Sequence, residues 1–256
     1  NSAPEIWPEA PGNLAFRFQA GNAEDTRASM AKAAHVVDLD LVNNRVSATP
    51  IEPRAGLGGY DPGSDRYTLS FTGQGLHGIR DELAKVFNLP PERFHLKAPD
   101  VGGGFGMKAF SYPEHFAVGF ASRELNRPVR WMSDRSEGMM TDAMGRDHVT
   151  TARAAFDKDL KLQAIWFSVV AGLGAYNSPF GQYIPSEVAK NVLPGVYDVQ
   201  VGLFEVKGAY TNTCPVDSYR GAGRPEAIYQ IERLMEFSAR QLGAGRLRDD
   251  RLIAIF

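Results

Sequence analysis

The chain has 256 residues, which leaves room for one large domain or two small ones. Hydrophobic residues make up 43% and charged residues 23% of it, close to the averages of folded globular proteins, so a disordered or collagen-like chain is excluded. The 28 lysines and arginines nearly cancel the 30 acidic residues, and this balance argues against a nucleic acid or a membrane surface as a partner.

Cysteine content and apolar runs indicate the compartment. Cys214 is the only cysteine, which excludes a disulfide within the chain and any cysteine-built zinc or iron–sulfur site of its own. No apolar run approaches the roughly 18–20 residues of a membrane span, and residues 1–11 are acidic and proline-rich, unlike a secretory signal. We therefore expect a cytoplasmic protein.

Short helices and strands alternate in the first part of the chain. Residues 1–22, with prolines at 4, 8 and 11, are expected to form an extended lead-in. Prolines and glycines crowd the stretch from 50 to 63 and predict a long loop there. Around this loop, hydrophobic spacing predicts a helix at 23–34, strands at 35–41, 45–48 and 67–71, an amphipathic helix at 76–86 and a strand at 94–98.

The second part begins with another helix. It is predicted from residue 111 to about residue 125, because Ser111 and Glu114 have the spacing of a capping box. A strand at 129–132 follows, and then a long hairpin with strands at 149–156 and 162–170. Asp157 and Asp159 at its tip are interpreted as an ordinary turn rather than a calcium loop.

The last predicted helix follows a glycine-rich stretch. Pro225 suits its first position, Glu226 suits the positive charge at a helix start, and Gly243 suits its end. Its apolar face is expected to comprise Ile228, Ile231, Met235 and Leu242.

The order of elements favours an α+β fold over a barrel or a helical bundle. We expect a duplicated βαβ-like domain with mixed sheets and packed helices. It would span residues 23–256 and be divisible into subdomains at about 23–145 and 146–256.

Two glycine-rich loops carry the chemistry that the sequence suggests. The loop at 102–106 has no side chain except that of Phe105, so its backbone N–H groups can converge on an oxyanion. The loop at 221–223 runs into a predicted helix start, where the helix dipole favours negative charge, and Arg220 and Arg224 flank it. Either loop alone is compatible with an ordinary tight turn. The two together indicate a phosphate-bearing cofactor.

Other sites fit the sequence less well. Neither loop has the pattern of a P-loop, and the five histidines lack metal-ligand spacing. Residues 104–109 match a dinucleotide-binding pattern, with Glu124 at a suitable distance for a ribose, but the predicted helix starts after the glycines. An NAD-binding enzyme is therefore the weaker alternative. Gln74 lies in a polar cluster before a predicted helix, where its amide could donate to an oxo or phosphate group or simply cap the helix.

Several motifs occur together in a specific order. The segments at 100–108 (DVGGGFGMK) and 219–227 (YRGAGRPEA) resemble the large, molybdenum-binding subunit of the molybdenum hydroxylases. This family includes xanthine dehydrogenase, aldehyde oxidoreductase and carbon monoxide dehydrogenase. Shorter segments at 50–54, 74–77, 127–131 and 134–137 extend the resemblance over nearly the whole chain. The chain is similar to the first molybdopterin-binding domain of that subunit.

The resemblance implies a molybdenum ion on a molybdopterin, in bacteria usually the cytosine dinucleotide form, that hydroxylates a small-molecule substrate with oxygen from water. It also implies partner subunits: a small subunit with 2Fe-2S clusters and a medium subunit with FAD. By analogy, the residues that bind the cofactor would be Gln74, Gly103, Gly104, Phe105, Gly106, Arg220, Gly221, Ala222 and Gly223. Gln74 would hydrogen-bond an oxo group or the cofactor, and none of these residues is expected to ligate the metal.

Departures from the family pattern bear on the substrate. Copper-containing carbon monoxide dehydrogenases have a cysteine directly after the arginine that matches Arg220, where Gly221 stands here. Xanthine-type enzymes have a glutamate at the position of Ala109 and a phenylalanine at that of Ala222. The resemblance therefore favours an aldehyde-oxidoreductase-like or carbon-monoxide-dehydrogenase-like enzyme without the copper site.

Length is the largest departure. The general-base glutamate of the family lies in a second half of the molybdenum subunit, so no catalytic residue is expected in this chain. We therefore expect a domain of a larger oxidoreductase that is inactive as an isolated piece. The alternative is a stand-alone or truncated module that binds the cofactor or assists assembly without catalysis.

Overall fold

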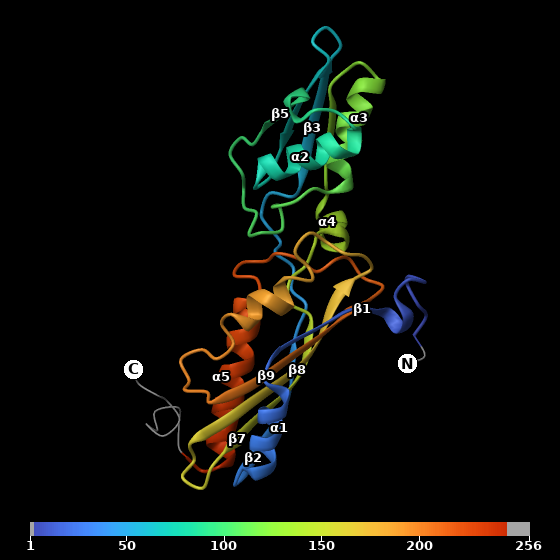
Figure 1. Ribbon diagram of the computed structural model, residues 1–256. Coiled ribbons are helices and arrows are strands. Elements are labelled where there is room, and N and C mark those ends of the chain that lie inside the picture. Colours follow the sequence, from blue (N-terminus) through green and yellow to red (C-terminus); the bar gives the residue numbers. More distant parts are fainter. Residues whose placement is uncertain (1–2, 245–256) are drawn as a thin grey trace. The chain divides into compact units, whose positions relative to one another are not determined.

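The computed structural model describes residues 3–244 and divides into two compact units, each with its own sheet (Figure 1). Unit 1 contains the described residues up to Val46, then Gly145–Asp217, and the described residues from Gly221 onward. Unit 2 contains Ser47–Met144 and Ser218–Arg220. This division differs from the expected subdomains, because residues before 47 supply strands to the sheet of unit 1.

Unit 1 is built on a five-stranded sheet with the order β1-β9-β8-β7-β2. The strands are β1 (Leu14–Gly21), β2 (His35–Asn43), β7 (His148–Phe156), β8 (Leu162–Gly174) and β9 (Val201–Tyr210). Only β8 and β9 pair in parallel; the other neighbours are antiparallel. The expected lead-in thus contains a strand, since β1 pairs with β9 along its length.

Helices cover the sheet of unit 1. Helix α5 (Arg224–Gln241) packs on β7 and β2, and α1 (Ala23–Lys32) packs on β8 and β9. The α5 face is close-packed, because Ala152 and Ala154 of β7 leave room for Ile231 and Leu234, and all four are fully buried. Two short turns of helix, η1 (Pro11–Asn13) and η3 (Ile184–Val188), complete the unit.

Unit 2 is built on a four-stranded sheet with the order β5-β4-β3-β6. Its strands are β3 (Ala55–Asp61), β4 (Arg66–Phe71), β5 (Phe94–Lys97) and β6 (Val129–Met132). Its helices are α2 (Leu76–Phe87), η2 (Pro91–Arg93), α3 (Pro113–Glu124) and α4 (Arg135–Thr141). Helix α2 joins β4 to its parallel neighbour β5, which makes a β–α–β unit. Tyr67, Leu69, Phe71, Ile79 and Leu83 form the core between strand and helix.

The α+β fold class is confirmed, but the loop expected at 50–63 is wrong. Strand β3 occupies half of that stretch and pairs with both β4 and β6. Its glycines are explained by close packing rather than by turns. A Cβ atom at Gly58 would lie 2.3 Å from the carbonyl oxygen of Val118 in α3, so only glycine lets the helix approach the strand.

Three smaller predictions are also corrected. Residues 45–48 make only an isolated bridge, from Val46 to Gly145, and no strand. Helix α3 is capped by Tyr112 rather than by Ser111, because the Tyr112 N–H donates to Nδ1 of His115. On α5, Ile228 is 43% exposed, and Leu234 lies in the core where Ile228 was expected. None of the helices within residues 3–244 is long and apolar enough to cross a membrane.

Candidate functional site

In unit 2, Gln74 is bound to the glycine-rich loop at 102–106 through both its backbone and its side chain. It lies between β4 and α2, where its N–H donates to the carbonyl of Lys108 at 2.8 Å. Its side-chain oxygen Oε1 accepts from the N–H of Gly106 at 2.9 Å. The residue is exposed, and within residues 3–244 its amide nitrogen has no acceptor. One end of the amide therefore holds the loop, and the other end can donate to a ligand.

The loop itself presents unused backbone donors. Gly103 and Gly106 have φ angles of +101° and +98°, and Phe105 has a φ of +54°, so the chain turns sharply at each. The N–H groups of Gly103, Gly104 and Phe105 find no acceptor in the described part of the chain. A Cβ atom at Gly104 would lie 2.4 Å from Oε1 of Gln74, and would fill the space that the glycine leaves open.

Arg220 joins the same cluster, within unit 2. Its N–H donates to the carbonyl of Phe105 at 2.8 Å, and its guanidinium lies 4.7 Å from the centre of the Phe105 ring. Phe105 is held by this contact and is 36% exposed. The structure thus brings together Gln74, the loop at 103–106 and Arg220, six residues that the sequence analysis selected from three separate segments.

The loop at 221–223 belongs to unit 1. Gly221 and Gly223 have φ angles of +89° and +83°, and the loop leads directly into α5. Among residues 3–244, no acceptor is found for the N–H groups of Gly221, Ala222 and Gly223. Arg224 donates to the carbonyl of Gly221 at 3.0 Å and so closes the turn. An 18-residue helix with unused N–H groups before its first turn attracts an anion.

Behind the Gly221–Gly223 loop lies a buried ion pair. Glu226, in the first turn of α5, is 1% exposed, and its carboxylate lies 3.1 Å from the guanidinium of Arg146. The sequence analysis expected Glu226 at the helix start but did not expect it to be buried. Next to this pair, burial lowers the pKa of His148, and the charge of Glu226 only partly opposes that shift.

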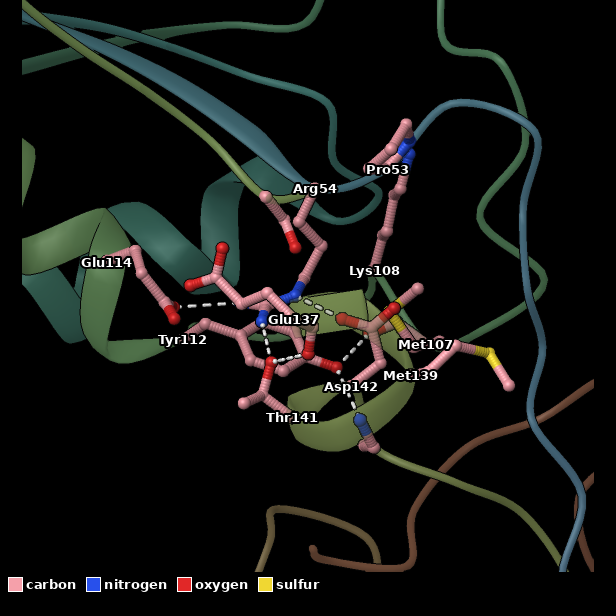
Figure 2. A network of polar contacts seen from close by, with 12 residues as sticks. Pro53, Arg54, Met107, Lys108, Tyr112, Glu114, Glu137, Met139, Thr141 and Asp142 are labelled. Carbon is pink, nitrogen blue, oxygen red and sulfur yellow. Dashed lines mark hydrogen bonds and ion pairs between the residues drawn. The ribbon is translucent and has the colours of Figure 1, made fainter. Parts of the chain in front are cut away.

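Unit 2 contains a second buried network, which is centred on Arg54 (Figure 2). Its guanidinium contacts Asp142 at 2.6 Å, Glu114 at 2.8 Å and the hydroxyl of Thr141 at 2.9 Å. It also stacks on the ring of Tyr112, at 3.8 Å from the ring centre. The Tyr112 hydroxyl donates to the carbonyl of Met107, so the network supports the chain where the glycine-rich loop ends.

Arg54 belongs to the segment at 50–54 that carries part of the family resemblance, but no role was predicted for it. Arg54 lies in the stretch that was predicted to be a loop, so no local signal marked it as a buried residue. Its partners could not be found in this way, because Glu114 and Asp142 are 60 and 88 residues away in the chain.

The arrangement of unit 2 also decides against the dinucleotide-binding alternative. Strand β5 ends at Lys97 and α3 begins at Pro113, so the glycines at 104 and 106 do not open a helix. A nicotinamide dinucleotide site needs the helix start directly at the glycines. Glu124 lies at the far end of α3 and forms an exposed ion pair with Arg123.

Residues 6–248 match the molybdopterin cofactor-binding domain family. The chain belongs to this family. The match confirms the resemblance found in the motifs at 100–108 and 219–227, and it agrees with the two donor-rich loops.

Known proteins that are similar to this chain include subunits of enzymes. The carbon monoxide dehydrogenase large chain of Afipia carboxidovorans is 35% identical over 233 residues, which cover 90% of this chain and 29% of that protein. The nicotine 6-hydroxylase large subunit of Paenarthrobacter nicotinovorans is 30% identical over 241 residues, which cover 91% of this chain and 29% of that protein. The crystal structure of quinoline 2-oxidoreductase from Pseudomonas putida 86 superposes with a TM-score of 0.88 at 32% identity, over 95% of this chain and 31% of that chain. The chain therefore spans less than a third of these relatives.

Proposed function

We propose that this molybdopterin-binding domain is part of the large subunit of a molybdenum hydroxylase. The observation that carries the proposal is the donor cluster of unit 2, in which Gln74 holds the Gly102–Gly106 loop and leaves its own amide nitrogen and three N–H groups unused. This donor set fits a group with oxo and phosphate oxygens, because each acceptor oxygen would satisfy donors that the described chain leaves open.

Each loop has a distinct role in the proposal. Gln74 donates to an oxo group or to the pterin, and the backbone from Gly103 to Gly106 lines that side of the cofactor. Arg220 holds Phe105 in place. The loop from Gly221 to Gly223, with Ala222 at its centre, offers N–H groups to a negatively charged part of the cofactor.

When bound, the molybdenum–pterin group supplies hydroxylation chemistry with oxygen from water. We propose the cytosine dinucleotide form of the cofactor. The general-base glutamate would come from the second half of the molybdenum subunit. Electrons would leave through a 2Fe-2S subunit to a FAD-containing subunit, in the cytoplasm.

The geometry also supports a substrate class without copper chemistry. A cysteine at position 221 would be strained, because Gly221 has a φ of +89° and a Cβ atom there would lie 3.0 Å from the Pro225 ring. Cys214 does not take that position, because it precedes Arg220 instead of following it directly, and within unit 1 its carbonyl and sulfur contact Arg45 at 3.0 Å and 3.7 Å. We therefore propose an aldehyde-oxidoreductase-like or carbon-monoxide-dehydrogenase-like hydroxylase that lacks the copper ligand.

The test is a metal and cofactor analysis of the complete protein, purified with its partner subunits. The proposal predicts stoichiometric molybdenum, a pterin that releases cytidine monophosphate on acid hydrolysis, and substrate-dependent reduction of the FAD. Absence of both molybdenum and pterin would contradict it. Molybdenum and pterin without turnover of any aldehyde or N-heterocycle would favour the non-enzymatic binding module.

A further inference from the structure

The two ends of the Gly102–Lys108 segment are bound to a single residue, Glu52. The N–H of Glu52 donates to the carbonyl of Gly102 at 3.2 Å, and the N–H of Gly102 donates back to the Glu52 carboxylate at 2.7 Å. At the other end, the ammonium of Lys108 donates to the Glu52 carbonyl at 2.8 Å and lies 3.3 Å from the same carboxylate oxygen. The loop is thereby closed into a ring.

The charges of this ring are unequally buried. The Lys108 side chain is 1% exposed and the Glu52 side chain is 32% exposed. Burial lowers the pKa of Lys108, and the contacts with Glu52 oppose that shift. An ammonium group this deeply buried needs its partner, so the lysine holds Glu52 in one position.

The space around Glu52 is also tightly shaped. A Cβ atom at Gly102 would lie 2.5 Å from the Cβ of Glu52, so glycine is required for the contact. The carbonyl of Lys108 accepts the N–H of Gln74, which ties the ring to the other donor of the site. Between the two held ends, the N–H groups of Gly103, Gly104 and Phe105 find no acceptor within residues 3–244.

Electrostatics gives the pair a second role. The Glu52 carboxylate sits on the N–H of Gly102, at the start of a loop that we propose to bind an anionic cofactor. An unbalanced carboxylate there would repel such a group. Lys108 neutralises that charge and keeps the rest of the loop attractive to anions.

We infer that Glu52 and Lys108 are a positioning pair for the Gly102–Gly106 loop: they hold its ends and balance its charge so that its central N–H groups face the cofactor. The inference rests on the proposed function for the identity of the ligand. The conformational part, that the pair orders the loop, does not depend on it.

The experiment compares Lys108→Met, Glu52→Gln and the double variant in the complete protein. Glu124→Gln is the matched control, because Glu124 is an exposed ion-pair partner in the same unit. Amide hydrogen exchange is measured at Gly102, Gly106 and Met107, whose N–H groups are hydrogen-bonded, in protein from a host that lacks pterin synthesis. Molybdenum content is measured in protein from a competent host.

We expect Lys108→Met to accelerate exchange in the loop by about tenfold or more and to lower molybdenum content by a similar factor. The double variant should regain part of the molybdenum that Lys108→Met loses, since the unbalanced carboxylate is then gone. Glu124→Gln should match the wild type in both measurements. Glu52→Gln keeps the shape of the side chain and provides the test if Lys108→Met does not fold.

Two results would overturn the inference. One is wild-type exchange in the loop of both folded single variants. The other is a double variant with no more molybdenum than Lys108→Met, which would show that charge balance plays no part. If the wild-type protein itself contains no molybdenum, the proposed function fails, while the exchange data still decide whether the pair orders the loop.

Discussion

A Cβ atom added at Gly104 would lie 2.4 Å from the side-chain oxygen of Gln74, the same oxygen that accepts the N–H of Gly106. The glycine and the glutamine therefore depend on each other. A side chain at 104 must displace the amide, and a displaced amide releases the loop.

We expect Gly104→Ala to lower the molybdenum content of the complete protein about tenfold. This factor corresponds to the loss of one hydrogen bond that contributes roughly 1.4 kcal/mol. The effect should shrink in a Gln74→Ala background, where the clash is absent. Gly78→Ala is the control, because a Cβ atom there meets nothing within 4 Å in α2. It should instead stabilise the helix by about 0.5–1 kcal/mol. Equal molybdenum content in Gly104→Ala and wild type would contradict the prediction.

Replacing Gln74 itself tests the amide directly. Gln74→Ala removes the acceptor for Gly106 and the exposed amide nitrogen, so we expect a loss of bound molybdenum of at least about tenfold. Metal analysis by mass spectrometry measures it. Gln241→Ala, at an exposed position near the end of α5, should leave the metal content unchanged. Full occupancy in the Gln74 variant would remove this residue from the site.

The buried pair of Arg146 and Glu226 is expected to matter for the stability of unit 1. Arg146→Met would leave the Glu226 carboxylate, 1% exposed, without its charged partner and should cost about 3 kcal/mol or more. Arg233→Met is the control. Arg233 lies on α5, the helix that carries Glu226, and it is 50% exposed, so its ion pair is worth under about 1 kcal/mol. Scanning calorimetry of the complete protein should show a clear drop in melting temperature for the first variant only.

Because of the buried His115, we expect the stability of unit 2 to depend on pH. Burial, aided by the nearby charge of Arg54, lowers its pKa from 6.5 to about 3. The folded state therefore resists protonation, and the stability that neutral His115 provides is present above pH 6.5 and is lost as the pH falls toward 3. Between pH 6.5 and 5, the slope should approach about 1.4 kcal/mol per pH unit.

His115→Asn tests this dependence, because asparagine keeps an acceptor for the N–H of Tyr112 but does not titrate. Denaturant unfolding of the complete protein, followed by a probe in unit 2, should lose most of the slope in this variant. Identical slopes in variant and wild type would show that another group is responsible.

Local signals account for the parts of the fold that were predicted. Helix α2 was predicted from its apolar spacing, and the hairpin of β7 and β8 from its alternation around Asp157. Strand β3 was missed because glycines normally break strands. Its glycines are explained by the close approach of helix α3 and of the Phe71 ring. No local sequence pattern reveals these contacts.

The candidate site also has features that could be predicted from the sequence and features that could not. The donors of the Gly102–Gly106 loop follow from the lack of side chains and were predicted. The contacts that hold the loop were not, because Glu52 and Lys108 are 56 residues apart and the partners of Arg54 lie farther still. A buried charged residue can be identified only once the partners that neutralise its charge are known. The fold brings those partners together from distant parts of the chain.

The most direct test is a crystal structure of the complete protein with anomalous data at the molybdenum edge. The account predicts one molybdenum peak per large subunit, with a cofactor whose oxo, phosphate or pterin oxygen atoms accept hydrogen bonds from Gln74 and from the N–H groups of the loop at 103–105. A cofactor bound without contact to either would contradict the account.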